Sequence, residues 1–319
     1  MTSEHVIYTA ADSSYELQAR VLLQSLVRTQ LHATRLTIFG DGWSVEMVER
    51  LERIATNFVS VEVVNVTSEM LSNVQLSNNF PLATTYNVLA PLTHLEGVDL
   101  ALYMDADCVV RKDLSALFSA PPSTPVAAVV DAHVAMMGVP SMWRPWREEQ
   151  ADPNIAYLNT GVMLVNVASW RSSEITERVL SLLGKYQLPC VDQDALNLVL
   201  RGSFDRLEPK YNSMPYHLMK LLRNADLVET DDAIGDAIID PSIIHFHRSF
   251  LGKPWNFGCS HPARHLWSDL ASEVSPRWRR KLDVLGIARG VAAKYAKMST
   301  LDERAEQMQG LEIEDANSE

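Results

Sequence analysis

Short apolar runs of strand length alternate with stretches of helical spacing along most of the chain. The first apolar runs are 5–10, 36–39 and 61–66, and helical spacing fills 15–30 and 45–58 between them. This alternation is typical of a mainly parallel sheet flanked by helices. With 319 residues, 47% of them hydrophobic, the chain can bury a large core. We therefore predict an α/β fold built as one large domain, or as one domain with an appendage.

The same alternation continues through the middle of the chain. Residues 84–95 have helical spacing around Pro91, which we expect to kink or end the helix. Strands are predicted at 100–104 and 126–130, with a short helix at 113–118 between them. Ligands of open α/β sheets bind at the carboxyl ends of the strands, so the residues that follow these strands are the first candidates for a site.

Charge and cysteine content exclude several classes of protein. A formal net charge of −12 argues against general nucleic-acid binding. The three cysteines, Cys108, Cys190 and Cys259, have no pairing spacing, and the N-terminal residues contain no apolar signal region. The apolar runs are too short to cross a bilayer. We expect a cytoplasmic protein.

Asp105 and Asp107 follow the predicted strand 100–104 and are separated by a single residue. If both belong to the strand, their side chains point to the same face. Two carboxylates held that close repel each other unless a cation or a shared proton lies between them. The pair therefore predicts a metal site.

Further polar residues stand at the ends of later elements. Asn159 precedes Gly161 at the start of an apolar run, and Asp192, Gln193 and Asp194 lie at the start of a predicted helix. Helix capping accounts for one acid there, but less readily for the whole triplet. His245 ends an apolar strand shortly before a Lys-Pro-Trp sequence at 253–255, which makes it a candidate third metal ligand.

Taken in order, these motifs resemble glycosyltransferase family 8, the retaining sugar-nucleotide transferases that include bacterial lipopolysaccharide galactosyltransferases and glycogenin. The resemblance runs from about Val6 to Trp255. It implies a Rossmann-like nucleotide-sugar-binding domain of the GT-A type with a mainly parallel central sheet over 1–258. A small helical C-terminal extension is then expected over 259–319.

The resemblance also assigns roles at the nucleotide and at the metal. Asp12 resembles the residue that accepts a hydrogen bond from the edge of the uracil ring. Tyr15 resembles the aromatic residue that stacks on the uracil. Ala10 belongs to the same uridine pocket. Asp105 and Asp107 resemble the metal-binding pair, with Asp107 also near the ribose, and His245 resembles the third metal ligand.

For the sugar and the diphosphate, the family pattern implies a second set of residues. Asn159 and Asp192 resemble the residues that hold the donor sugar hydroxyls, and Gln193 resembles the side chain facing the anomeric carbon. Lys253 is similar to the lysine that holds the departing diphosphate, and Arg248 is expected to share that role.

The residue types suit this chemistry. A divalent cation and Lys253 would stabilise the charge that develops on the leaving diphosphate. Imidazole beside two carboxylates favours Mn²⁺, with Mg²⁺ as the alternative. Gln193 is not a strong nucleophile, so a one-step route in which the acceptor enters on the leaving-group face stays open. Asp194 is the nearest nucleophile for a two-step route.

Two departures from the family pattern concern the donor. The family usually has Arg where Val88 stands, which leaves the identity of the sugar open. The segment 247–251 lengthens the loop between His245 and Lys253.

Two segments have two interpretations each. Residues 133–153 interleave Met and Trp with charged side chains, which fits either packing on the core or an acceptor-binding surface. Residues 276–298 are basic and amphipathic, which fits either a solvated helix or peripheral contact with an anionic membrane face.

The sequence thus predicts a metal-dependent retaining hexosyltransferase (EC 2.4.1.-) that uses a UDP-hexose of the glucose or galactose type. Its acceptor is a saccharide, a lipid-linked glycan, a protein or a small molecule. Two other classes compete with it. One is a sugar-nucleotide-binding protein without turnover. The other is a phosphatase of the haloacid dehalogenase type, whose Asp-x-Asp motif usually ends the first strand of its domain.

Overall fold

The computed structural model describes residues 4–66, 82–134, 143–218, 232–247, 249, 251–276 and 278. The chain separates into two compact units, 1–247 and 248–319. The division falls between His247 and Arg248, a little before the predicted domain boundary at 258/259.

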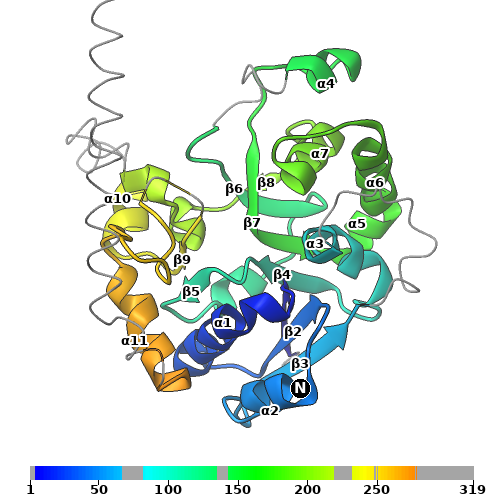
Figure 1. The fold of residues 1–319 in the computed structure, drawn as a ribbon. Coiled ribbons are helices and arrows are strands. Elements are labelled where there is room, and N and C mark those ends of the chain that lie inside the picture. The colour runs from blue at the N-terminus through cyan, green and yellow to red at the C-terminus, as the bar shows by residue number, and fades with distance from the viewer. Residues whose placement is uncertain are drawn as a thin grey trace, which may run out of the picture. The chain divides into compact units, whose positions relative to one another are not determined.

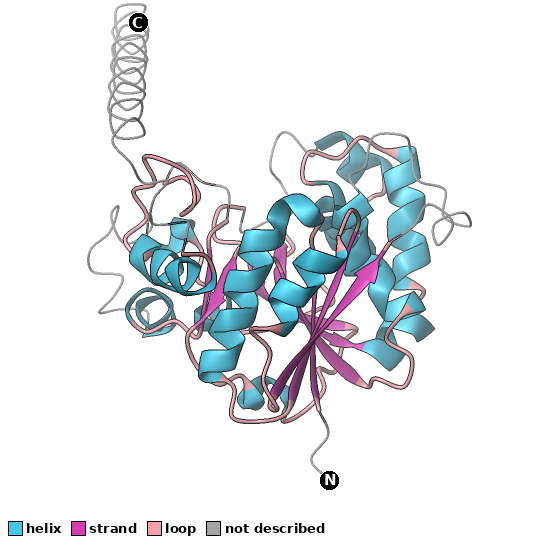
Figure 2. Cartoon of the chain, turned by 60° about the horizontal axis from the view of Figure 1, so that its bottom comes forward, coloured by secondary structure: helices cyan, strands magenta, loops and turns pink. Residues whose placement is uncertain are grey.

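A seven-stranded sheet forms the centre of the first unit (Figure 1). Its strand order is β3-β2-β1-β4-β7-β6-β8. The pairs β3·β2, β2·β1, β1·β4 and β6·β8 are parallel, whereas β7 runs antiparallel to both β4 and β6. The strands are β1 His5–Ala10, β2 Thr34–Gly40, β3 Val59–Asn65, β4 Leu100–Met104, β6 Val126–Val130, β7 Leu158–Asn166 and β8 Asp205–Arg206. The predicted mainly parallel α/β sheet is confirmed, and its strands fan out by twist (Figure 2).

Two apolar clusters cover the two faces of this sheet. Neighbouring residues of a strand point to opposite faces, so Ile7 and Leu102 join one cluster while Tyr8 and Tyr103 join the other. Helices α1 Glu16–Thr29 and α2 Val45–Glu52 pack on the first face. The second face carries α3 Leu82–Thr93, α5 Val167–Ser172, α6 Ile175–Lys185 and α7 Val191–Leu200, which group together in Figure 1. Both faces are buried, which explains why the strands read as continuous apolar runs.

Most predicted elements agree with the structure within a few residues. Strands 5–10, 100–104 and 126–130 are found as predicted, and Pro91 lies inside α3 without ending it. The predicted short helix at 113–118 is a 3₁₀ turn, Ser115–Phe118.

The predicted helix 45–58 is too long, because α2 ends at Glu52. The Thr56 hydroxyl accepts from the backbone N–H groups of Phe58 and Val59, at 3.3 and 3.0 Å. This side-chain turn competes with the helix and directs the chain into β3.

A two-stranded antiparallel ribbon stands beside the main sheet. It pairs β5 Cys108–Val110 with β9 Ile243–His245, and places Cys108 opposite His245. α10 Asp232–Ile239 precedes β9. The ribbon thus joins two segments that are distant in sequence at the carboxyl end of β4.

The segment 133–153 is described only in part. α4 Trp143–Glu148 buries Trp146, at 3% exposure, in the same cluster as Tyr157 and Leu158. This contact fits the packing interpretation for the described part of the segment.

The second unit contains α11 Arg264–Val274 and a row of indole rings. Trp267 is fully buried, with its ring centroid 5.5 Å from that of Trp255 and 5.1 Å from that of Trp278. Apart from Pro276 and Trp278, the predicted amphipathic segment 276–298 lies outside the described residues. Among the described residues, no helix is long and apolar enough to cross a bilayer.

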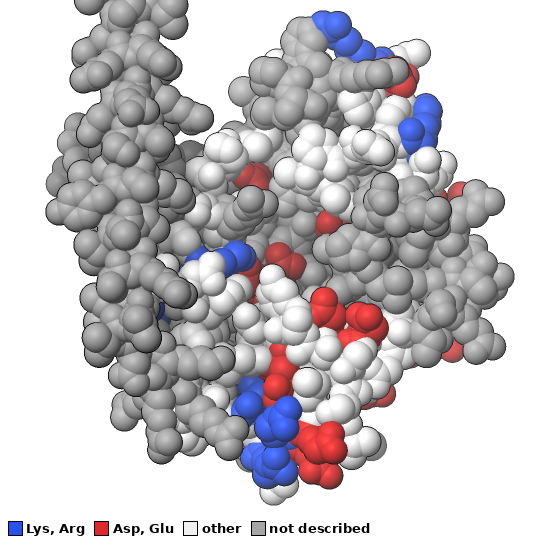
Figure 3. Space-filling view, viewed as in Figure 1, with Lys and Arg blue, Asp and Glu red and all other residues white. Residues whose placement is uncertain are grey.

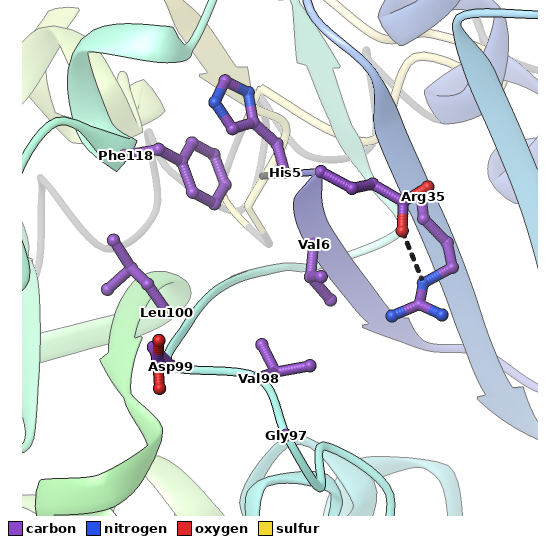
Figure 4. A pocket seen from close by; sticks show the side chains of 9 residues that line it. His5, Val6, Arg35, Gly97, Val98, Asp99, Leu100 and Phe118 are labelled. Atoms are coloured by element: carbon purple, nitrogen blue, oxygen red, sulfur yellow. Dashed lines mark ion pairs between the residues drawn. The ribbon is translucent and has the colours of Figure 1, made fainter. Parts of the chain in front are cut away.

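A cavity of about 290 Å³ lies at the amino ends of β1 and β4 (Figure 4). An ion pair between Arg35 and Glu4, 3.6 Å long, stands on one side of it, and Phe118 stacks on His5 on the other. The cavity is at the opposite edge of the sheet from Asp105 and Asp107, which follow the carboxyl end of β4.

Gly40 provides a test of how tightly β2 is packed against the loop after β1. A Cβ at Gly40 would lie 1.8 Å from the backbone oxygen of Ala11. That oxygen is held by the indole N–H of Trp43 at 2.8 Å. We expect Gly40→Ala to lower the free energy of unfolding by about 3 kcal/mol in urea denaturation.

Gly97→Ala is the control for that experiment. Gly97 has a φ of +73° and open space around it, so its substitution costs only the left-handed backbone conformation, about 1 kcal/mol. Equal losses in the two variants would contradict the packing described for Gly40.

Candidate active site

Asp105 and Asp107 lie in the turn that joins β4 to β5. The backbone N–H of Cys108 donates to the Asp105 oxygen at 3.0 Å, and the N–H of Asp105 donates to Gly161 on β7 at 2.9 Å. The two acids therefore follow β4, as predicted, and the alternation of side chains along a strand does not apply to them. Their carboxylates still converge, because the turn brings both of them next to the imidazole of His245.

The His245 imidazole lies between the two carboxylates. Its Nε2 is 3.3 Å from Asp105 Oδ2 and 3.3 Å from Asp107 Oδ1. The side chains of His245 and Asp107 are 1% and 9% exposed, whereas that of Asp105 is 40% exposed. Solvent can therefore reach the site at Asp105, whereas His245 and Asp107 are buried. The structure brings together the three residues that were predicted to bind metal.

This donor set fits a divalent cation. Adjacent ligands about 2.1 Å from an octahedral ion lie about 3 Å apart, close to the separations between the imidazole nitrogen and the two carboxylates. Mixed oxygen and imidazole donors suit Mn²⁺ or Mg²⁺. The ligand atoms of Asp107, Cys108 and His245 also lie within 4.8 Å of one another, so the Cys108 thiol is a nearby donor that sequence reasoning missed.

The charges at this point already favour a positive group. Burial alone lowers the pKa of His245, but the carboxylates of Asp107 and Asp105 outweigh it and raise the pKa to about 9. The Tyr103 hydroxyl donates to Asp105 Oδ1 at 2.7 Å, and Asp105 Oδ2 is the oxygen near His245. Figure 3 shows acidic side chains gathered in the middle of the face turned toward the viewer, and such a concentration of negative charge attracts cations.

Asn159 and Gln193 meet beside this cluster, at the start of β7 and of α7. Asn159 Nδ2 donates to Gln193 Oε1 at 3.2 Å, and the N–H of Thr160 donates to the same oxygen at 3.1 Å. Both amides also donate to Oδ2 of Asp131, at 2.7 Å from Asn159 and 3.3 Å from Gln193. Asp131 is 3% exposed and directly follows β6. Sequence reasoning missed it, although an acid at the carboxyl end of an apolar strand was the available signal.

Asn87, on α3, donates a hydrogen bond from its Nδ2 to Asp192 Oδ2 at 2.5 Å. Burial raises the pKa of Asp192 to about 7; the Asn87 bond opposes that rise and the charge of Asp105 adds to it. Val88, one residue further along the helix, is fully buried in the apolar cluster. Asn87, and not Val88, is therefore the side chain of this helix that reaches the acid.

Asp194 points into the protein. It is fully buried, and its oxygens accept from the Tyr157 hydroxyl and, at 2.8 Å, from the backbone N–H of Cys190. These bonds give Asp194 a structural role at the start of α7 and argue against the role of nucleophile.

The predicted uridine residues cluster after β1. Asp12 accepts from the backbone N–H of Ser14 at 2.8 Å and so caps the turn that leads into α1. Tyr15, in that turn, is 41% exposed, and Ala10 ends β1. The stacking ring is therefore accessible to a planar ligand.

The predicted diphosphate residues belong to the second unit. Lys253 Nζ lies 5.5 Å from the centroid of the Trp255 ring. Arg248 lies outside the described residues. The role of both residues at the leaving group stays a prediction.

Comparison with known proteins gives matches over most of the chain. The profile of glycosyl transferase family 8 matches residues 6–259. General stress protein A of Bacillus subtilis (strain 168) is 28% identical, covering 81% of this chain and 90% of its own. A lipopolysaccharide 1,2-glucosyltransferase of Escherichia coli is 27% identical, covering 84% and 77%.

A solved structure of galactosyltransferase LgtC in complex with donor and acceptor sugar analogs has a similar fold. Its TM-score is 0.67 at 20% identity, and the match covers 88% of this chain and all of that one. The shared fold is of the GT-A type, as the resemblance in the sequence implied.

Gly161 tests the geometry of the cation site without removing a ligand. A Cβ at this position would lie 2.1 Å from Cε1 of His245. Because the β5·β9 pairing holds the backbone of His245, we expect Gly161→Ala to turn the imidazole and weaken Mn²⁺ binding at least about 10-fold. Titration of free Mn²⁺ by electron paramagnetic resonance measures this, with Gly97→Ala as the matched control. Unchanged Mn²⁺ affinity in Gly161→Ala would argue against His245 as a ligand.

Proposed function

The chain belongs to glycosyl transferase family 8 and is a glycosyltransferase, and from this premise we propose that it is a metal-dependent, retaining hexosyltransferase. Its donor is a UDP-hexose and its cation Mn²⁺, with Mg²⁺ as the alternative. The observation that carries the proposal is the convergence of Asp105, Asp107 and His245 at the carboxyl edge of the sheet.

At this site a bound divalent cation would neutralise charge on the departing diphosphate. Asp105, Asp107 and His245 would hold it through two oxygens and Nε2. Asp12 and Tyr15 would bind the uracil ring by a hydrogen bond and by stacking. Lys253 is proposed to add a positive charge at the leaving group.

The sugar end of the site contains fixed amides and a carboxylate that can ionise near neutral pH. Asn159 and Asp192 would bind the sugar hydroxyls, and the Gln193 amide, oriented by Asp131, would stand at the anomeric carbon. With Asp194 committed to Tyr157 and Cys190, a one-step route is favoured. The bond from the anomeric carbon to the phosphate oxygen breaks, the acceptor oxygen bonds to that carbon on the same face, and the hydroxyl proton passes to the diphosphate.

We propose a glycan as the acceptor. The names of the matched relatives include a lipopolysaccharide glucosyltransferase, and an aromatic ring pair lies beside Asp131, which accepts from the backbone N–H of His133 at 2.8 Å. The exposed His133 ring stacks on Tyr216, with centroids 4.1 Å apart, and Tyr216 contacts His247 edge-on. Such a ring pair suits the apolar face of a sugar.

The rival classes make different predictions. A phosphatase of the haloacid dehalogenase type is disfavoured, because three described strands precede the one that Asp105 follows, and because Asp105 faces an imidazole. A binding protein without turnover would use the same cation site, so transfer or hydrolysis of the sugar must separate it from an enzyme.

The decisive experiment combines donor binding with turnover. We expect one UDP-sugar with Mn²⁺ to raise the melting temperature and to be turned over, and chelation of the metal to abolish both effects.

Asp107→Asn should reduce turnover by at least 100-fold. Loss of a residue that only supports a metal ligand typically costs about 10–100-fold, and Asp107 is itself a proposed ligand. Asp240→Asn, which removes an exposed carboxylate paired with Lys112, is the control. Undiminished turnover in Asp107→Asn would refute the assignment.

Asn87 gives a prediction for the pH dependence of donor binding. Its amide favours the ionised form of Asp192, so Asn87→Ala should raise the pKa of that carboxyl above about 7. Less carboxylate is then present at neutral pH. The pH at which UDP-sugar affinity reaches half its maximum should move upward, while affinity for UDP itself changes little.

Calorimetric titrations with UDP-sugar and with UDP, between pH 5.5 and 9 (roughly the range in which such a group titrates), measure this shift. Val88→Ala is the matched control, since Val88 neighbours Asn87 but faces the apolar cluster. An unchanged profile in Asn87→Ala would exclude Asp192 as the sugar-binding carboxylate.

A further inference from the structure

A buried amide connects the cation site to the sugar site. Asn212 ends a short 3₁₀ turn, Pro209–Asn212, and is fully buried. Its Oδ1 lies 2.9 Å from His245 Nδ1, and its Nδ2 donates to Asn159 Oδ1 at 2.8 Å. One side chain thus contacts both a proposed metal ligand and a proposed sugar-binding residue.

The direction of these hydrogen bonds follows from a backbone donor. The N–H of Gly161 donates to Asn159 at 3.0 Å, so the Asn159 atom that it contacts must be the oxygen. Asn212 must then present its NH₂ group to that same oxygen and its own oxygen to His245. It follows that His245 Nδ1 donates to Asn212, so Nε2, which faces Asp105 and Asp107, is the ring nitrogen that can exchange its proton for a cation.

The connection continues from Asn159 to the sugar site. Asn159 Nδ2 donates to both Asp131 Oδ2 and Gln193 Oε1. The path from His245 through Asn212 and Asn159 to Gln193 therefore consists of three successive side-chain hydrogen bonds. In a buried network of this kind, each bond constrains the next.

The backbone already holds this turn without the Asn212 side chain. The N–H of His245 donates to the Ser213 oxygen at 3.0 Å, and the N–H of Ser213 donates to Ile243 at 2.9 Å. A residue needed only for packing at position 212 could be apolar. The amide is instead placed where one acceptor and one donor are required.

We propose that Asn212 is a positioning residue that couples the cation site to the donor-sugar site. Its oxygen selects the tautomer of His245 that leaves Nε2 available to a cation, and its NH₂ group fixes the amides of Asn159 and Gln193. This inference rests on the proposed function. It predicts that Mn²⁺ and the hexose of the donor strengthen each other's binding through this side chain.

Two substitutions separate the two bonds. Asn212→Asp keeps an acceptor for His245 Nδ1–H but replaces the donor to Asn159 by a second oxygen. Asn212→Leu has a similar shape and removes both bonds. Asn166→Asp, at the start of α5, is the control, because Asn166 caps that helix through its oxygen and can do so as Asp.

Three quantities are measured on the whole protein: Mn²⁺ affinity without nucleotide, by electron paramagnetic resonance, and the affinities for UDP and for UDP-sugar at saturating Mn²⁺. In Asn212→Asp we expect Mn²⁺ affinity within about 3-fold of wild type and a loss of about 10-fold in UDP-sugar affinity, with UDP affinity unchanged. In Asn212→Leu we expect Mn²⁺ affinity to fall about 10–100-fold as well. Asn166→Asp should leave all three unchanged.

The outcomes distinguish this inference from the proposed function. Wild-type affinities in a folded Asn212→Leu or Asn212→Asp protein would overturn the coupling role and leave the proposed function standing. Equal loss of UDP and UDP-sugar affinity in Asn212→Asp would also overturn it, since the sugar would then not sense Asn212. Failure of the wild-type protein to bind any UDP-sugar with Mn²⁺ would instead refute the proposed function.

Discussion

The approach of one imidazole to two carboxylates is the contact on which the rest of the site depends. His245 reaches Asp105 and Asp107 because β5 leaves the main sheet and pairs with β9, and because Gly161 leaves room for the ring. Like charges at this distance repel, so the arrangement is stable only with positive charge between them. The imidazole supplies part of that charge, and the separations leave room for a cation to supply more.

Around this contact, the polar groups are ordered from the sheet outward. The end of β4 and the turn after it provide the acids, the start of β7 provides Asn159, and α7 provides Asp192 and Gln193. Buried groups behind them bind the two amides through hydrogen bonds, Asp131 to Asn159 and Gln193, and Asn212 to Asn159. The orientation of the outer residues is thereby set before any ligand arrives, which is what stabilisation of a developing charge requires.

The sequence predicted the sheet well because buried strands and helices have local patterns. Strand 100–104 was found as predicted, but the separate short strand at 108–110 was not predicted, because its pairing with β9 depends on residues far along the chain. Asn212 carries no local signal, because its role depends on partners far along the chain, whereas the signal for Asp131 was its place at the carboxyl end of an apolar strand. The departure at Val88 gave no signal for Asn87 beside it, because one residue along a helix rotates a side chain by about 100°. Only the packing of α3 against α7 shows that Asn87 is the residue facing Asp192.

We propose that Asp105, Asp107 and His245 bind a divalent cation that holds a UDP-sugar. Anomalous diffraction at the manganese edge, from crystals grown with Mn²⁺ and UDP, tests it most directly. We expect a strong peak about 2.1–2.3 Å from His245 Nε2 and from oxygens of both aspartates, with UDP phosphate oxygens completing the coordination. A manganese peak elsewhere with UDP bound, or bound UDP without manganese at these residues, would contradict it.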